Sequence, residues 1–329
     1  MMLRYDVLAI GNAIVDVIVA APPVFLEERG IAKGSMRLIS ADEAETLYGA
    51  MGAGREISGG SAANTVVGMA ALGARPAFVG RVAADQLGDV FTHDIRAAGV
   101  DFSTPASSNG NPTGRCLIVV TPDGDRTMNT YLGACQELTV ADLDPAVVAA
   151  SGILYLEGYL WDPPAPRAAM ETAIAMARAA GRRVAMTLSD VFCVEGHRAD
   201  FQRLLANHVD LMFANENEAC ALYQTNDLAV AMAELRKHAC VTVITRSEKG
   251  AVVLADGMEH VVPAEPPVRV LDTTGAGDLF AGGFMAAMVQ GRALPDCAAA
   301  GCVAASEVIS HYGARPEADL KALVAARLG

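Results

Sequence analysis

The strongest signal in this chain of 329 residues is the stretch Asp272-Thr273-Thr274-Gly275-Ala276-Gly277-Asp278. The segment Val268-Arg269-Val270-Leu271, which we expect to form a strand, precedes it, and an apolar segment that we expect to form a helix to about residue 289 follows it. The backbone amides of Gly275, Ala276 and Gly277 then lie at a helix N-terminus, where amide donors and the helix dipole stabilise phosphate oxygens.

Asp278 falls in the first turn of that predicted helix, beside the anion site. A carboxylate there can accept the proton of an attacking hydroxyl, while the amides stabilise charge on a transferring phosphoryl group. For this stretch alone, an ordinary acidic helix start with a tight glycine turn explains the residues equally well. The stretch matches neither a Walker A loop nor G-x-G-x-x-G, so those nucleotide-binding motifs are absent from it.

Short apolar runs alternate with segments of helical periodicity along most of the chain. We expect strands at 7–10, 78–79, 153–156, 184–188, 211–214 and 241–245, and helices at 61–72, 87–98, 165–180, 198–206 and 227–239. Strands separated by helices predict βαβ units and a mainly parallel sheet with helices on both faces. The sequence therefore predicts an α/β fold.

Two regions, at 14–40 and 112–132, interrupt this alternation. The second is typical of a hairpin, with strand-like runs on either side of the turn Pro122-Asp123-Gly124. We interpret both regions as strands that leave the main sheet and form a small β lid. No repeat or long linker divides the sequence, so we expect residues 1–329 to form a single domain with this inserted lid.

Composition and charge limit the partners. With 25 Lys and Arg against 38 Asp and Glu, the net charge is −13, which does not attract nucleic acid or anionic lipid. Seven cysteines without C-x-x-C spacing predict neither a disulfide framework nor a structural zinc site. Without a signal-peptide pattern or a long apolar span, we expect a cytoplasmic protein with no membrane partner. The sequence leaves open whether it is a monomer or a homodimer.

A second stretch, Ser58-Gly59-Gly60-Ser61-Ala62-Ala63-Asn64, precedes an Ala-rich helical segment. With the stretch at 272–278, it resembles the two signatures of the PfkB, or ribokinase-like, family of carbohydrate and nucleoside kinases. The similarity extends over nearly the whole chain and includes Gly11-Asn12-Ala13-Ile14-Val15-Asp16, Gly80-Arg81-Val82 and Asn215-Glu216-Asn217-Glu218. The resemblance implies a ribokinase-like three-layer α/β/α fold, with ATP as phosphate donor and Mg²⁺ as cofactor.

The resemblance also implies a role for each matched residue. Asp278 would be the catalytic base, and Gly275, Ala276 and Gly277 would form the anion hole. The substrate would be bound by Asn12, Asp16, Gly60, Ser61, Asn64 and, from the lid hairpin, Arg126. ATP would be bound by Asn215, Thr245, Gly250 and Gly277. Glu218 would place Mg²⁺ through water, and Asp272 and Thr274, with Gly313, would approach a monovalent cation such as K⁺.

Several of these residues also have ordinary structural explanations. Asn215 can cap a helix that has Glu218 in its first turn, and both roles can hold at once. Arg126 is equally well explained as a surface side chain in a turn. The loop from Thr245 to Gly250 departs from the family pattern Thr-x-Gly-x-x-Gly, because Ser247 replaces the first glycine.

The spacing of Asn12 and Asp16 narrows the choice of phosphoryl acceptor. Asp16 follows Asn12 by four positions, which resembles the G-N-x-x-x-D pattern of the adenosine kinases, whereas ribokinases place the pair two positions apart. We therefore expect ATP-dependent phosphorylation of the 5′-hydroxyl of adenosine or a related purine nucleoside. A nucleobase is usually held by an aromatic face. Here Tyr159 and Trp161 only flank the position that adenosine kinases fill, and Trp161 either covers the base or packs under the lid.

Three alternatives differ in how well the residues support them. A sugar kinase acting on ribose or fructose is the main one, because the aromatic pattern is incomplete. A non-catalytic nucleotide or sugar sensor is disfavoured, because Asp278, the turn glycines and the Asn-x-x-Glu pair are all present. A dinucleotide-dependent oxidoreductase lacks its phosphate-binding fingerprint.

Overall fold

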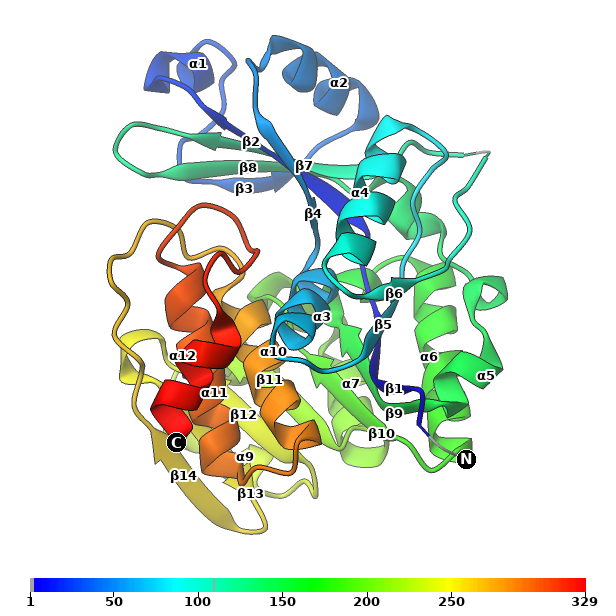
Figure 1. Cartoon of the computed structure of the whole chain (residues 1–329), viewed down its shortest axis with the longest axis vertical. Coiled ribbons are helices and arrows are strands. Elements are labelled where there is room, and N and C mark those ends of the chain that lie inside the picture. Colours follow the sequence, from blue (N-terminus) through cyan, green and yellow to red (C-terminus); the bar gives the residue numbers. More distant parts are fainter. Residues whose placement is uncertain (1–2, 109) are drawn as a thin grey trace.

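In the part of the chain that the structure describes, nine strands form the main sheet, and Figure 1 shows them below a smaller, separate sheet. The computed structural model describes residues 3–108 and 110–329. Within them, the strand order is β14-β13-β12-β11-β10-β9-β1-β5-β6. The strands are β1 (Tyr5–Ile10), β5 (Pro76–Val79), β6 (Asp101–Phe102), β9 (Ser151–Glu157), β10 (Arg183–Thr187), β11 (Leu211–Asn215), β12 (Val241–Thr245), β13 (Ala251–Ala255) and β14 (Met258–Val262). Neighbours from β12 to β6 are parallel, whereas β13 and β14 are antiparallel, which confirms the mainly parallel sheet.

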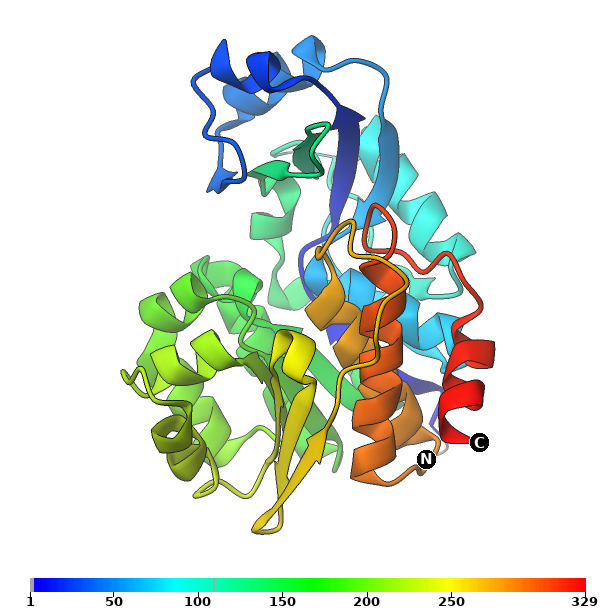
Figure 2. The same cartoon turned by 90° about the vertical axis from the view of Figure 1, so that its left-hand side faces the viewer.

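Helices cover both faces of this sheet, as Figure 2 shows. One face carries α3 (Ser61–Ala71), α4 (Gln86–Ala97), α10 (Ala276–Val289) and α11 (Leu294–Val308), with α12 (Leu320–Leu328) against α11. The other carries α5 (Pro145–Ala149), α6 (Pro164–Ala179), α7 (Val191–Asn207), α8 (Glu216–Leu222) and α9 (Leu228–Leu235). Short 3-10 helices are η1 (Gly133–Glu137), η2 (Val140–Asp142), η3 (Gly158–Trp161) and η4 (Ser247–Lys249). The predicted three-layer α/β/α fold is confirmed.

Strand β1 explains why both faces must be covered. Val7 and Ala9 belong to one buried cluster, and Leu8 and Ile10 belong to the other. Successive side chains of a strand point to opposite faces, so a continuously apolar strand needs a helical layer on each side. Within the described residues, no helix combines the length and apolar character needed to cross a membrane.

Among the described residues, the second sheet has five strands in the order β3-β8-β7-β2-β4. They are β2 (Ile14–Ala20), β3 (Met36–Leu38), β4 (Arg55–Gly59), β7 (Gly114–Val120) and β8 (Arg126–Tyr131). The helices α1 (Pro23–Glu27) and α2 (Ala41–Ala50) lie above it in Figure 1. Strands β7 and β8 form the hairpin predicted within 112–132. Strand β4 lies outside both regions that the sequence suggested for the lid, and it pairs antiparallel with β2.

The two faces of this small sheet pack differently. Val15, Val17 and Val19 belong to the large buried cluster that also contains Leu47 of α2. The other face gathers Cys116, Ile118 and Val120, with Ile14, Ile18 and Met128 packed against them. This inner face is therefore largely apolar, with Asp16 and Thr130 as polar members, and part of it lines the cavity described below.

One predicted strand is wrong. Residues 268–271 form no strand, although an apolar run stands there. Val268 is 96% exposed and Val270 is 62% exposed, so neither is buried in a sheet. Pro266 and Pro267 precede them, and proline lacks the N–H that a ladder needs. The segment is instead tied to the end of α11, where the Leu271 amide donates to the carbonyl of Ile309 at 2.8 Å.

Candidate active site

A cavity of about 510 Å³ opens where the parallel strands end, between the main sheet and the small sheet. Ligands of open α/β sheets bind at this carboxyl edge of the strands. The main sheet and its helices contribute Asn12, Ser61, Asn64, Glu157, Asn215, Glu218, Thr245 and Asp278 to the lining. The small sheet contributes Ile14, Asp16, Met36, Leu38, Cys116, Met128 and Thr130. Most of the residues predicted from sequence are thus brought together.

Asp278 lies in the first turn of α10 and is held by two donors from α3. Ser61 Oγ donates to Oδ1 at 2.6 Å, and Asn64 Nδ2 donates to Oδ2 at 2.9 Å. Burial raises the pKa of Asp278, and these two hydrogen bonds and the nearby Arg315 oppose the rise. Ser61 and Asn64, expected to face the substrate, therefore also hold the base candidate in place.

The glycine turn before α10 has the geometry of an anion site. Gly275 has a left-handed φ of +78°, and a Cβ there would lie 2.5 Å from Ala314 Cβ, so only glycine fits without strain. The Ala276 amide donates to the carbonyl of Thr273 at 3.2 Å, which closes the turn. Apart from the adjoining residues and the backbone of its own helix, no described atom lies within 4 Å of the position that a Cβ on Gly277 would take, so this side of the turn is open to a ligand.

Asp272 and Arg126 form a buried ion pair behind this turn. Arg126 Nη2 lies 2.5 Å from Asp272 Oδ2, and Nη1 donates to Thr274 Oγ1 at 2.6 Å. Burial lowers the pKa of Arg126, and the charge of Asp272 opposes that change. Arg126 is not among the residues that line the cavity. The contact with phosphate expected for it stays a prediction, while its side chain joins β8 to the turn.

Glu157 is a functional candidate that the sequence analysis did not identify. It ends β9, is 0% exposed, and its Oε1 accepts from the amide of Asn12 at 2.8 Å and from Asn12 Nδ2 at 2.7 Å. Its Oε2 accepts from the Ala62 amide at 2.7 Å. Burial raises its pKa to about 7. A charged residue that ends an apolar strand just before Gly158 is the signal that could have revealed it, because such carboxylates are rarely buried without a task.

Asp16 and two amide oxygens face the remaining polar part of the cavity. Asp16 is 6% exposed, and burial raises its pKa to about 7, against the charges of Arg315 and Arg126. Asn12 Oδ1 and Asn64 Oδ1 are buried and have no hydrogen-bond partner within the described part of the chain. Buried polar atoms normally have partners, so these acceptors are suited to the hydroxyls of a ligand.

Asn215 and Glu218 form a reciprocal cap at the start of α8. Asn215 Oδ1 accepts from the Glu218 amide at 2.8 Å, and Glu218 Oε2 accepts from the Asn215 amide at 3.0 Å. Both residues also line the cavity, so the structural role does not exclude the role predicted for them, which stays a prediction. Burial raises the pKa of Glu218 to about 7.

The two residues that were predicted to bind ATP from the loop after β12 lie in different surroundings. Thr245 lines the cavity, but Gly250 does not. Gly250 has a φ of +84°, and a Cβ on it would lie 2.0 Å from the Val262 carbonyl oxygen. Its position is therefore explained by the close approach of β14, and its predicted contact with ATP stays a prediction.

The aromatic side chains near the predicted base position also differ in whether they line the cavity. Trp161 is 0% exposed, and its Nε1 donates to Asp200 Oδ2 at 3.2 Å, so it packs in the core and does not line the cavity. Tyr159 and Phe192 do line it, with ring centroids 5.9 Å apart. The first of the two roles left open for Trp161, covering a base, is thus not supported by its position.

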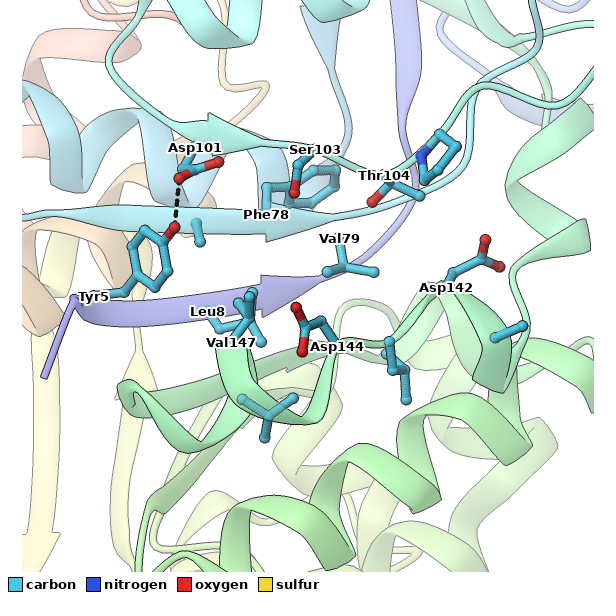
Figure 3. Close-up of a pocket in the computed structure, with 15 residues that line it drawn as sticks. Tyr5, Leu8, Phe78, Val79, Asp101, Ser103, Thr104, Asp142, Asp144 and Val147 are labelled. Carbon is cyan, nitrogen blue, oxygen red and sulfur yellow. Dashed lines mark hydrogen bonds between the residues drawn. The ribbon is translucent and has the colours of Figure 1, made fainter. Parts of the chain in front are cut away.

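A second cavity, of about 260 Å³, lies beside β1, β5 and β6 of the main sheet (Figure 3). Its walls include Tyr5, Asp101, Asp142 and Asp144, and the Tyr5 hydroxyl donates to Asp101. Asp142 is already paired with Arg81 at 2.9 Å. None of the predicted site residues lines this cavity, so the chemistry belongs to the larger one.

The family can now be stated. The pattern of the pfkB family carbohydrate kinases matches residues 31–320, and the chain belongs to this family. It is therefore a phosphotransferase that has an alcohol group as acceptor and ATP as phosphate donor, as the sequence predicted.

Relatives support both acceptor classes. Adenosine kinase 1 of Arabidopsis thaliana is 28% identical over 333 residues, which cover 93% of this chain and 94% of the relative. The solved adenosine kinase from Sinorhizobium meliloti is 51% identical, has a TM-score of 0.91 and matches over 98% of this chain and 99% of its own. A structure described as a probable sugar kinase protein, from Rhizobium etli CFN 42, is 48% identical, has a TM-score of 0.92 and matches over 99% of each chain.

Proposed function

We propose that this protein transfers the γ-phosphoryl group of ATP to the 5′-hydroxyl of adenosine and so produces AMP. The observation that carries the choice of a nucleoside is the apolar inner face of the small sheet. Met36 is 44% exposed and Leu38 is 58% exposed, yet both line the cavity. An exposed apolar wall suits a flat nucleobase, whereas a free sugar offers it little apolar surface. The similarity to the adenosine kinase of Sinorhizobium meliloti supports the same choice.

The polar part of the cavity suits the ribose. Asp16 would accept hydrogen bonds from ribose hydroxyls, and the unpartnered oxygens of Asn12 and Asn64 would add acceptors. Gly60 allows the chain to approach closely, because a Cβ there would lie 2.1 Å from the Asn12 carbonyl oxygen. A ribose held in this way would present its 5′-hydroxyl towards Asp278.

Asp278 would take the proton of the 5′-hydroxyl as the phosphoryl group is transferred in line. The backbone amides of the turn, which is open to a ligand at Gly277, would stabilise charge on the transferring group. The small sheet would cover the substrates and exclude water, which otherwise competes as an acceptor. Asn215 and Thr245, which also line the cavity, would contact the phosphates of ATP.

The carboxylates fit a Mg²⁺ ion that is carried mainly by ATP. No group of three or more His, Cys, Asp or Glu in the described ranges could hold a metal by itself. Mg²⁺ keeps several waters and is usually bound through one or two carboxylates and phosphate oxygens. Glu218, already in the cavity wall, would hold such waters, and the ion would neutralise charge on the phosphates.

A sugar kinase is the second candidate. The polar cluster of Asp16, Asn12 and Asn64 suits a furanose with or without a base, and the Rhizobium etli neighbour is described as a sugar kinase. In that case ribose or fructose would be the acceptor, and the roles of Asp278 and the turn would be unchanged.

The deciding experiment measures ADP formation from Mg·ATP with adenosine, inosine, guanosine, ribose and fructose. Asp278→Ala is the blank. Asp89→Asn is the matched control, because Asp89 is also an acidic residue in the first turn of a helix, on the exposed side of α4. Adenosine turnover far above the sugars, abolished only in Asp278→Ala, supports the proposal. A preference for ribose or fructose favours the sugar kinase instead.

A further inference from the structure

The carboxylate of Asp272 is buried at the start of the glycine turn and holds two loops together. Its Oδ1 accepts from the Thr274 amide at 2.9 Å, and its Oδ2 accepts from the Gly313 amide at 2.8 Å. The side chain is 0% exposed. A buried carboxylate needs a counter-charge as well as hydrogen bonds, because an uncompensated charge in the interior is costly.

Arg126 supplies that counter-charge from the small sheet. Its guanidinium lies against Asp272 Oδ2 and donates to Thr274 Oγ1, and its side chain is 9% exposed. Its Cζ lies 6.0 Å from the centroid of the Tyr312 ring, which covers it from the loop after α11. Among the residues that the structure describes, Arg126 is the only basic side chain in an ion pair with Asp272.

This arrangement does not fit the monovalent cation that the resemblance implied for Asp272, Thr274 and Gly313. K⁺ is held by a shell of oxygen atoms. Here both carboxylate oxygens of Asp272 and the hydroxyl of Thr274 already accept from N–H donors. A guanidinium in contact with Oδ2 would also repel a second cation at the same place.

We propose that Arg126 is the built-in counter-ion of Asp272, that it takes the place of a monovalent cation, and that phosphoryl transfer by this protein requires neither K⁺ nor Na⁺. Because Arg126 begins β8, the counter-charge arrives with the small sheet and is not drawn from the solvent. Arg126 is on this view a positioning residue, which keeps the turn in shape through Asp272 and Thr274.

The first test is the cation dependence of turnover, and this readout alone rests on the proposed kinase function. Initial rates with saturating adenosine and Mg·ATP are compared in KCl, NaCl and tetramethylammonium chloride at equal ionic strength, with ATP as its Tris salt. Equal rates in the three salts are expected. A saturable rise of several-fold with K⁺ or Na⁺ in the wild-type protein would overturn the proposal.

The second test uses thermal unfolding without substrates, so it is independent of the acceptor. Arg126→Met removes the charge and keeps the length, and we expect its Tm to fall by roughly 5 °C or more in tetramethylammonium chloride, because Asp272 loses its counter-ion. KCl should restore part of that loss. Arg37→Met is the matched control, since Arg37 lies on β3 of the same sheet and pairs with Glu43. Its Tm should not respond specifically to K⁺. A K⁺-specific rise in the wild-type Tm contradicts the proposal.

The third test locates the ion directly. Thallium(I), which substitutes for K⁺ and scatters anomalously, is soaked into crystals of both proteins. We expect no thallium at Asp272 in the wild type and thallium at Asp272 in Arg126→Met. Thallium beside Asp272 in the wild type would overturn the proposal. So would an Arg126→Met protein that neither binds thallium there nor responds to K⁺, because Arg126 would then not stand in for a cation.

Discussion

Asn64 Nδ2 donates a hydrogen bond to Asp278 Oδ2 at 2.9 Å, and this contact joins the first turn of α3 to the first turn of α10. The donor stabilises the charged carboxylate and so lowers the pKa of Asp278, against the effect of burial. The carboxylate is thereby kept able to accept a proton and is held in one orientation. Asn64, which is predicted to contact the substrate, can thus also set the strength of the proposed base.

Asn64→Ala should therefore shift the acidic limb of the kcat profile to higher pH and lower its plateau. The Asp278 carboxyl loses a donor and keeps its burial, so its pKa rises further. Rates measured from pH 5 to pH 9 test this, with Ser61→Ala as the companion variant that removes the bond to Oδ1. An acidic limb that stays at the same pH in both variants would show that Asp278 is not the group that titrates.

Asp278→Asn should lower kcat by roughly 10³-fold and leave the Kd of adenosine nearly unchanged. The amide keeps the shape of the carboxylate but cannot accept the hydroxyl proton. Single-turnover kinetics and calorimetric binding of adenosine separate the two effects. A loss of binding that matches the loss of rate would argue for a role in substrate affinity.

The two glycines of the turn should respond differently to alanine. Gly277→Ala adds a methyl group in open space, so the Tm should hardly change while kcat falls by about 10²-fold, because the phosphate can no longer approach. Gly275→Ala must adopt a positive φ and meets Ala314, so it should be destabilised by roughly 1–3 kcal/mol. Thermal unfolding and rates of the pair check this. Equal Tm losses would contradict the open side at Gly277.

The pH dependence of thermal stability should reveal the ionisation of Asp16. Its folded-state pKa of about 7 lies above the 3.8 of an exposed carboxyl, so the folded chain binds more protons than the unfolded chain between these values. Stability from this group is therefore present at low pH and is lost as the pH rises to about 7. Asp16→Asn should flatten the decline of Tm between about pH 4 and pH 7, whereas the exposed Asp42→Asn should not. An unchanged slope in Asp16→Asn would show that Asp16 ionises at its usual pKa.

Leu38→Asn tests the apolar wall of the small sheet. Leu38 is 58% exposed, so the change should cost little stability. A nucleobase would lose an apolar contact, and we expect KM for adenosine to rise by roughly tenfold, with kcat less affected. Val268→Asn, at an exposed site away from the cavity, is the control. Equal KM values for Leu38→Asn and the wild type would place the base elsewhere.

Sequence reasoning recovers the fold where local and tertiary preferences agree. The central strands, such as β9 and β11, contain continuous apolar runs that only a sheet covered on both faces could bury. It fails at 268–271, where an apolar run follows two prolines and finds no partner strand. It also misses β4, whose mixed sequence becomes a strand only because β2 pairs with it.

The site is recovered as a set of residues but not as a set of contacts. The motifs identify Asp278 and Asn64, yet only the packing of α3 on α10 brings them within a hydrogen bond. Glu157 belongs to no motif in the sequence analysis, and its importance comes from the three N–H groups that converge on it. Arg126 and Asp272 are 146 residues apart in the chain, and no local pattern couples them.

Strand β4 ends at Gly59, and after Gly60 the chain enters α3 directly. The small sheet, which would cover the substrates, is therefore joined to α3 by a single residue. A shift of the small sheet should be transmitted to Ser61 and Asn64, because no linker lies between them to absorb it. Chimeras that exchange the small sheet between members of this family should consequently take both the catalytic rate and the acceptor preference of the protein that supplies the sheet.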